Sequence, residues 1–313
     1  MPSGEMDVRS HGRESGGRDE LVARLARALP ADGAAEPLPG VVVRRASAPT
    51  DLGHGVASPS FCVIAQGAKE VLLGDRRYPY DPAHYLIATA ALPVASRVTA
   101  ASPERPYLSL ILGLDPGLVG AVMVEAADPA PRSRAAATAI DVSPLGAGLL
   151  DATVRLARLL DDPADAPFLA PLVTREIVYR LLRGAQGDRL GQITALGGQT
   201  HRIAAAVERL RRDFAKPLRV EDVAREIGMS VSGFHHHFKA MTALSPLQYQ
   251  KQLRLQEARR LMVGEELDAA SAGHRVGYDD PSHFSREYRR LFGAPPMQHT
   301  GQLRGGTAES TAL

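Results

Sequence analysis

Hydrophobic residues in segment 220–238 recur at helical spacing in two short runs, with Gly228 between them. Gly228 can end the first helix in the left-handed conformation, and Ser230 can cap the second. Phe234 and Phe238 lie one turn apart on that second helix, so both face the core. This spacing predicts a helix-turn-helix whose second helix exposes a polar stripe on its other face.

The same pattern recurs in segment 267–296. Gly277 takes the place of the first turn glycine, and Phe284 and Tyr288 take the places of the two phenylalanines. The second turn is one residue longer than the first. Gly273 stands where the first copy has Ala224, which keeps the packing close but costs about 1 kcal/mol of helix propensity.

The residues between the two copies, 246–264, read as one helix opened by Ser245 and Pro246 and closed near Gly264. About 18 residues rising 1.5 Å each give a helix of roughly 27 Å. Successive major-groove faces of DNA are roughly 34 Å apart. A helix of this length can therefore place the two second helices in neighbouring grooves.

Two segments carry a family resemblance, namely GMSVSGFHHHFKAMTALSPLQYQKQLRLQEARRLM and VGYDDPSHFSREYRRLFGAPP. Together they resemble the paired helix-turn-helix domain of AraC/XylS-type transcriptional regulators. The departures are Gly273, where alanine is usual, and Ala243-Leu244, where many members have a glycine. The resemblance implies double-stranded promoter DNA as the partner, with RNA polymerase as a further candidate. The predicted DNA-binding residues are Ser232, His235, His236, Lys239, Ser282, His283, Ser285, Arg286 and Arg289.

Charge supports this assignment, although the net charge of +2 over 313 residues is unremarkable. Residues 200–300 hold 16 Lys and Arg against 12 Asp and Glu, whereas residues 1–199 hold 20 against 22. The basic excess therefore lies in the predicted DNA-binding domain. A single cysteine, no secretory signal, and an apolar stretch broken at Asp115-Pro116 favour a cytoplasmic protein without a membrane segment.

The N-terminal part has a different pattern. Residues 1–39 are expected to form a flexible segment with one short helix over Asp19–Leu29. Short apolar runs then recur about every 8 to 12 residues from Val41 to Leu114, which predicts a sandwich or barrel of strands. The string FCVIAQGAKEVLLGDRRYPYDPAHYLIATAALPV resembles an AraC-type sensor domain, which implies a cupin-like barrel for 40–190 and an effector that the sequence does not identify.

After the strands the chain is expected to become helical. Two apolar-striped helices from Pro144 to about Ile193 pack on the barrel, form a homodimer contact, or do both, and the dimer is expected through the Leu149 to Leu182 region. A linker is expected over Gln186 to Gln199, followed by the double helix-turn-helix domain at 200–300 and a loose tail at 301–313. The fold class is thus α+β, a β-barrel with a helical pair followed by an all-α domain.

A cupin-like barrel also raises an enzymatic alternative, because many cupins bind a metal through closely spaced histidines. Here His54 and His84 are isolated, and consecutive helical residues such as His235 and His236 point about 100° apart. No nucleophile, triad or phosphate-binding loop stands out. We therefore expect a ligand-responsive DNA-binding regulator without catalytic residues, metal or cofactor; the alternative is a cupin-type metalloenzyme fused to a DNA-binding module.

Cys62, the only thiol, lies in the strand FCVIAQG, and its apolar neighbours do not reveal which face it occupies. Free cysteine is commonly buried and inert. Some relatives of this subgroup are associated with aldehyde responses, so the sharper hypothesis is a sensor of small carbonyl compounds or electrophiles. It would act through Cys62 or through a pocket lined by that strand. A reactive thiol needs solvent access and a lowered pKa, for example from a nearby Lys69.

Overall fold

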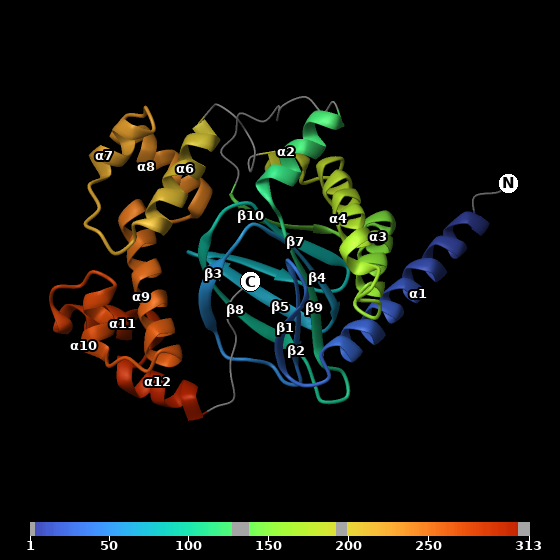
Figure 1. Ribbon diagram of the computed structural model, residues 1–313, viewed down its shortest axis with the longest axis horizontal. Helices are drawn as coiled ribbons and strands as arrows, with labels where there is room; N and C mark the ends of the chain where they lie inside the picture. The colour runs from blue at the N-terminus through green and yellow to red at the C-terminus, as the bar shows by residue number, and fades with distance from the viewer. Residues whose placement is uncertain (1–3, 127–137, 192–198, 306–313) are drawn as a thin grey trace.

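The computed structural model describes residues 4–126, 138–191 and 199–305 (Figure 1). The chain is mixed α and β, with a β-rich N-terminal domain followed by a helical C-terminal domain. None of the helices in the described ranges is both long and apolar enough to cross a membrane.

The described strands form two antiparallel sheets. The six-stranded sheet has the order β1-β2-β9-β4-β7-β10, and the four-stranded sheet has the order β3-β8-β5-β6. Whether the sheets close into a cupin-like barrel stays a prediction. The strands are β1 (Gly33–Leu38), β2 (Val41–Ala46), β3 (Gly53–Ala57), β4 (Ser60–Gln66), β5 (Ala68–Leu73), β6 (Arg76–Tyr80), β7 (His84–Ala88), β8 (Leu92–Ala100), β9 (Tyr107–Gly113) and β10 (Ile140–Pro144).

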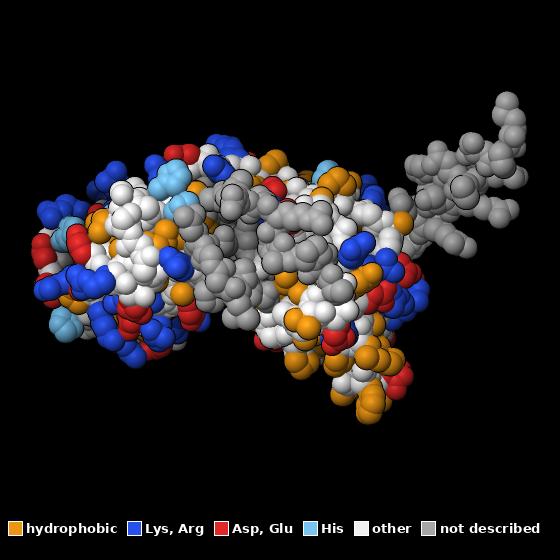
Figure 2. Space-filling view, turned by 90° about the horizontal axis from the view of Figure 1, so that it is seen from above, with side chains coloured by type: hydrophobic (Ala, Val, Ile, Leu, Met, Phe, Trp, Pro, Cys, Tyr) orange, Lys and Arg blue, Asp and Glu red, His pale blue; other side chains and the backbone are white. Residues whose placement is uncertain are grey.

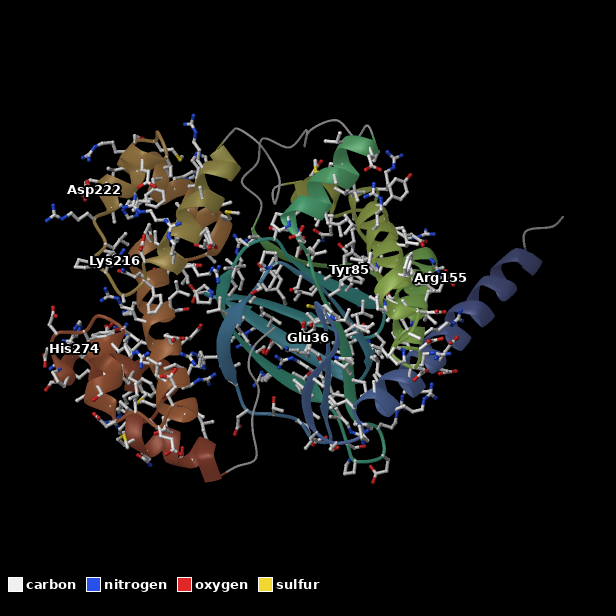
Figure 3. The ribbon with its side chains drawn as sticks, viewed as in Figure 1. Glu36, Tyr85, Arg155, Lys216, Asp222 and His274 are labelled. Carbon is white, nitrogen blue, oxygen red and sulfur yellow. The ribbon has the colours of Figure 1, made fainter. Side chains whose placement is uncertain are left out.

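The central strands β4, β7 and β9 of the six-stranded sheet are buried on both faces, which explains why their sequences are almost continuously apolar. Alternate residues such as Val43 and Val63 face a layer of helices, and they share one core with α1 (Gly4–Ala28), α3 (Ala147–Arg158) and α4 (Ala166–Leu182). The other set, including Cys62 and Ile111, faces the four-stranded sheet. Figure 3 shows Tyr85 of the sheet beside this helical layer, with Arg155 on the layer itself.

Seven of the described strands lie on the apolar runs between Val41 and Leu114 that predict them, and Gly74, with φ 58°, forms the turn between β5 and β6. Strands β1, β3 and β10 were not predicted. GAAEPL of β1 and GHGVA of β3 contain few β-branched residues, so their pairing partners rather than their propensity make them strands. Helix α2 (Pro116–Glu125) follows the Asp115-Pro116 break, where Asp115 caps it.

The N-terminal segment corrects the expectation of flexibility. The helix predicted over Asp19–Leu29 begins at Gly4, and Leu21 and Leu25 are fully buried in the core shared with the sheet. Residues 4–28 contain no proline, so nothing in the backbone forces a later start. Residues 33–38, also placed in that segment, form β1 at the sheet edge.

The C-terminal domain contains the helices that the sequence predicts and one further helix, which starts at Pro296. The helices are α6 (Gln199–Arg212), α7 (Val220–Glu226), α8 (Val231–Thr242), α9 (Pro246–Gly264), α10 (Ala269–Arg275), α11 (Pro281–Phe292) and α12 (Pro296–Gly305). In the linker region, α5 (Gly187–Leu190) is a short helix, and residues 192–198 lie outside the described residues. The predicted tail is wrong in its first part, because residues 301–305 continue α12, which starts at Pro296.

Candidate DNA-binding surface

The two helix-turn-helix units share the same turn conformation and the same kind of N-cap. Gly228 and Gly277 adopt left-handed φ values of 64° and 91° after α7 and α10. Ser230 and Asp280 cap the following helices, each accepting a hydrogen bond from a backbone N–H within the first turn. The second turn is longer by one residue, as expected, and an alanine Cβ at Gly273 would lie 3.0 Å from the Phe284 ring. The small residue at this position therefore lets α10 and α11 approach closely.

Each second helix buries its aromatic pair completely. On α8 the rings of Phe234 and Phe238 meet at 5.3 Å between centroids, and Phe238 also packs against Tyr249 of α9. On α11 Phe284 and Tyr288 meet at 5.6 Å. These aromatics are core residues, which fixes the rotation of both helices and turns the polar stripes outward.

The outward stripes are largely those predicted. His235 of α8 and Ser285 of α11 are half-buried, so they are less available than the sequence pattern indicated. Arg290, not among the predicted residues, is also exposed beside Arg289. The exposed predicted residues are Ser232, His236, Lys239, Ser282, His283, Arg286 and Arg289. Figure 3 shows Asp222 and His274, on α7 and α10, at the side of this domain that faces away from the β-rich domain.

The cations of these stripes differ from many of the described arginines, which form ion pairs. Among the described residues, neither Lys239, Arg286 nor Arg289 forms an ion pair with a carboxylate. By contrast, Arg211 is held by Glu208 at 2.9 Å. The only carboxylate on α11, Glu287, accepts from Lys251 of α9 at 3.1 Å and from Tyr278 at 3.4 Å. The exposed positive charges are therefore free to bind phosphate or base edges.

Arg254 of α9 was not predicted as a functional residue. It connects the segment before α7 with the second helix-turn-helix unit. Its guanidinium donates to the carbonyls of Phe214, Ala215 and Lys216 before α7 at 2.7 to 3.1 Å, and to the carbonyl of Gly277 in the second turn at 2.8 Å. One side chain thus joins the loop between α6 and α7 to the turn of the second unit through backbone acceptors. Every residue has a backbone carbonyl, so the sequence does not indicate which carbonyls Arg254 binds.

The helical domain is also docked on the β-rich domain. The Tyr249 hydroxyl donates to the carbonyl of Ala91 at 2.7 Å, and the Ala139 N–H donates to the carbonyl of Met241 at 2.9 Å. Arg259 of α9 donates to the carbonyl of His54 in β3. A single hydrophobic core runs from the inner faces of the sheets into α6, α7, α8 and the start of α9. The second unit has a core of its own.

Cys62 meets neither condition for a reactive thiol. It is fully buried between the sheets, and desolvation raises the pKa of the thiol to about 11. Lys69 does lie near enough to act on it, as the hypothesis required, but its charge lowers that pKa by less than burial raises it. Thiol chemistry with an electrophile therefore has no support here, and a ligand in a pocket beside this strand stays a prediction.

His54 and His84, the isolated histidines of the β-rich domain, each contact a neighbouring side chain. His54 packs edge-on against Phe292 at 5.2 Å, and burial together with Arg259 lowers its pKa to about 4. His84 pairs with Asp81 at 2.7 Å. Within the described part of the chain, no three His, Cys, Asp or Glu side chains are grouped so that they could hold a metal.

Comparisons with known proteins agree with this architecture. Residues 37–189 match the family model described as AraC-type transcriptional regulator N-terminus, and residues 223–302 match a helix-turn-helix domain. The HTH-type transcriptional regulator ArgR of Pseudomonas aeruginosa is 29% identical over 146 residues, which cover 46% of this chain and 44% of ArgR. The HTH-type transcriptional activator RhaS of Escherichia coli is 33% identical over 87 residues, 28% of this chain and 31% of RhaS.

The matched regions thus span less than half the length of these relatives. Among solved structures, fatty-acid-bound ToxT from Vibrio cholerae aligns with 86% of this chain and 97% of its own, with a TM-score of 0.52 and 9% identity. At that identity the likeness shows a shared fold. It extends over both domains.

Proposed function

We propose, from the premise that this chain belongs to the AraC-type family of transcriptional regulators, that it binds promoter DNA and responds to a small molecule held in its β-rich domain. The observation that carries the proposal is the pair of capped helices, α8 and α11, each with buried aromatics on one face and unpaired cations on the other. They pack on the same helix, α9, which at 19 residues is about 28 Å long.

On DNA, some of the exposed side chains would bind phosphates and others would contact base edges. Lys239, Arg289 and Arg290 supply positive charge for phosphates, which gives affinity that falls as salt rises. Arg286, near the middle of α11, can form the bidentate contact with a guanine edge that arginine geometry favours. His236 can donate or accept one hydrogen bond and so discriminates less.

We expect Arg286→Ala to weaken specific DNA binding by about 1 to 3 kcal/mol, and His236→Ala to weaken it less. The measurement is titration of the purified variants on a DNA site selected by the parent protein. Arg211→Ala is the matched control, since it removes an exposed arginine of α6 that lies outside the two stripes and is paired with Glu208. Unchanged affinity in both test variants, with native melting, would remove the assignment of these helices as DNA readers.

We also propose that the protein is a homodimer through the exposed face of α4, which lies within the Leu149 to Leu182 region expected from the sequence. Leu156 and Leu181 are fully buried within their own chain, so this part of the apolar stripes belongs to the core. The opposite face of α4 leaves Phe168 and Leu172 exposed at 84% and 61%, with Val124 of α2 nearby at 81%. Figure 2 looks down on the side where α2 lies and shows hydrophobic side chains gathered at a projecting edge.

A shallow groove of about 370 Å³ between α2 and α4 adjoins this face and includes the Glu125–Arg175 ion pair. A two-fold pairing would bury the exposed side chains of both chains against each other. RNA polymerase stays a candidate partner without an assigned surface.

We expect Leu172→Glu to yield a folded monomer in sedimentation equilibrium, because a carboxylate on this face would have to be buried without a partner. Leu247→Glu, at a comparably exposed leucine of α9, is the control and should leave the assembly unchanged. The proposal fails if the parent is monomeric at micromolar concentration, or if the Leu172 variant remains a dimer.

A further inference from the structure

Lys69 of β5 is a buried cation that the DNA-binding account leaves unused. Its side chain points between the sheets, because it shares a strand face with the core residues Val71 and Leu73 and is only 4% exposed. Its pairing partner in β6 is Tyr80, which is equally buried. Lysine is almost never buried to this degree unless something pairs with it.

The side chains around Lys69 are polar and come from both sheets. Arg44 of β2 and Cys62 of β4 act electrostatically on the ammonium from the six-stranded sheet. Tyr80 and Tyr107 interact through their hydroxyls and are likewise influenced by Arg44 and Cys62. Strands far apart in sequence thus bring hydrogen-bonding groups and positive charge to one place inside the domain.

The carboxylate next to Lys69 in the chain faces away from it. Glu70, the neighbour of Lys69, points to the other face of the sheet, where Arg97 and Arg77 hold it at 2.9 and 3.5 Å. Across the described residues, no carboxylate pairs with or hydrogen-bonds Lys69. Burial, followed by the repulsion of Arg44, lowers the pKa of Lys69 to about 8, so at neutral pH the ammonium is kept charged in an unfavourable setting. An uncompensated buried charge is costly to a fold and marks a functional site more often than a structural one.

We infer that the effector carries a carboxylate, which binds the Lys69 ammonium between the two sheets while the phenol hydroxyls of Tyr80 and Tyr107 donate to its oxygens. This inference rests on the proposed effector response and specifies its chemistry. A carboxylate supplies the missing charge and accepts several hydrogen bonds at once. The rest of the ligand would lie among the apolar side chains of the same core.

The position of Lys69 also connects such a ligand with the DNA-binding domain. The core that contains Tyr80 and Tyr107 continues through Leu92 and Val94 of β8 to Phe238 and Tyr249. Tyr249 is anchored on the carbonyl of Ala91 beside that strand. A ligand that shifts β8 would therefore act on the first helix-turn-helix unit before the second.

The test is a thermal shift assay on the full chain at constant ionic strength. The probes are the sodium salts of butyrate, hexanoate and benzoate, each beside its neutral amide, with sodium phosphate as an inorganic anion. At saturation a bound carboxylate is expected to raise the melting temperature of the parent by about 5 °C, while the amides and phosphate do not.

The decisive variant is Lys69→Met, which keeps the side-chain length and removes the buried charge. It should melt at or above the parent without ligand and lose the carboxylate shift, whereas Lys216→Met, at an exposed lysine, should keep that shift. An equal shift in Lys69→Met, an equal shift from an amide or phosphate, or no shift by any carboxylate overturns the inference. DNA titrations on the same preparations, without probes, distinguish failure of this inference from failure of the proposed function. If specific DNA binding is intact and no carboxylate shifts the melting temperature, the proposed DNA-binding function stands and only the inference of an anionic effector fails.

Discussion

Replacing Tyr288 with alanine is expected to unfold the second helix-turn-helix unit, at a cost of roughly 3 to 5 kcal/mol for truncating a fully buried aromatic residue. The ring packs at 4.4 Å from Phe292 and 5.6 Å from Phe284, and its hydroxyl lies 3.0 Å from Nδ1 of His299. DNA binding would be lost because α11 is no longer held. Circular dichroism melts, recorded together with DNA titrations, provide the measurement.

Tyr288→Phe is the matched control, since it removes only the hydrogen bond to His299 and should cost about 1 kcal/mol. Phe238→Ala should reduce folding stability as much as Tyr288→Ala does. Its effect should reach both domains, because Phe238 belongs to the core that they share, whereas Tyr288 belongs to the separate core of the second unit. We therefore expect Phe238→Ala to lower the main melting transition and Tyr288→Ala to create an earlier, separate one. If Tyr288→Ala retains native helicity and melting yet loses DNA, the tyrosine is a reader rather than a core residue.

Replacing Gly277 with alanine is the second change with a large expected effect. Its φ of 91° disfavours a side chain by about 1 to 2 kcal/mol, and the new Cβ would overlap the carbonyl of Ala215. That carbonyl cannot easily move, because Arg254 holds it together with its neighbours. We expect a total loss of about 3 kcal/mol or more, seen as a lower denaturation midpoint and weaker DNA binding.

Gly228→Ala is a control with the same backbone problem but more space. Its φ is 64°, and the nearest atoms to an added Cβ are those of the flexible Arg202 guanidinium at 3.7 Å. The loss of folding stability in Gly228→Ala should therefore stay near the about 1 to 2 kcal/mol that a side chain costs in the left-handed conformation. Equal destabilisation by both substitutions would show that the contact between Gly277 and Ala215 has no energetic weight.

Much of the C-terminal domain could be predicted because its determinants are local. A turn glycine, an N-cap and an aromatic pair one turn apart define each unit, and the structure places Gly228, Ser230 and Phe234 in those roles. The exposed stripe follows from helical geometry once the buried face is known. The half-burial of His235 beside the Phe234 ring does not, because it depends on the rotation of α8 within the packed domain.

The β-rich domain was less predictable because its decisive features arise between distant strands. Cys62 has apolar neighbours on both sides, so only the second sheet shows that it faces inward. Leu156 and Leu181 have the same periodicity in a dimer contact as in an intramolecular core, and their complete burial decides between the two. Strand β10 lies on the far side of a segment without apolar alternation and is a strand through its pairing with β7.

The central claim, that one chain reads two successive major-groove faces through α8 and α11, is tested most directly by selecting bound sites from random DNA and footprinting the parent and two variants on them. The account predicts two clusters of preferred bases about one helical turn, roughly 10 base pairs, apart in each half-site. Arg286→Ala should erase the preference in one cluster, and His236→Ala should weaken the other. Selected sites without a shared sequence, or a single cluster that neither substitution alters, would contradict the claim.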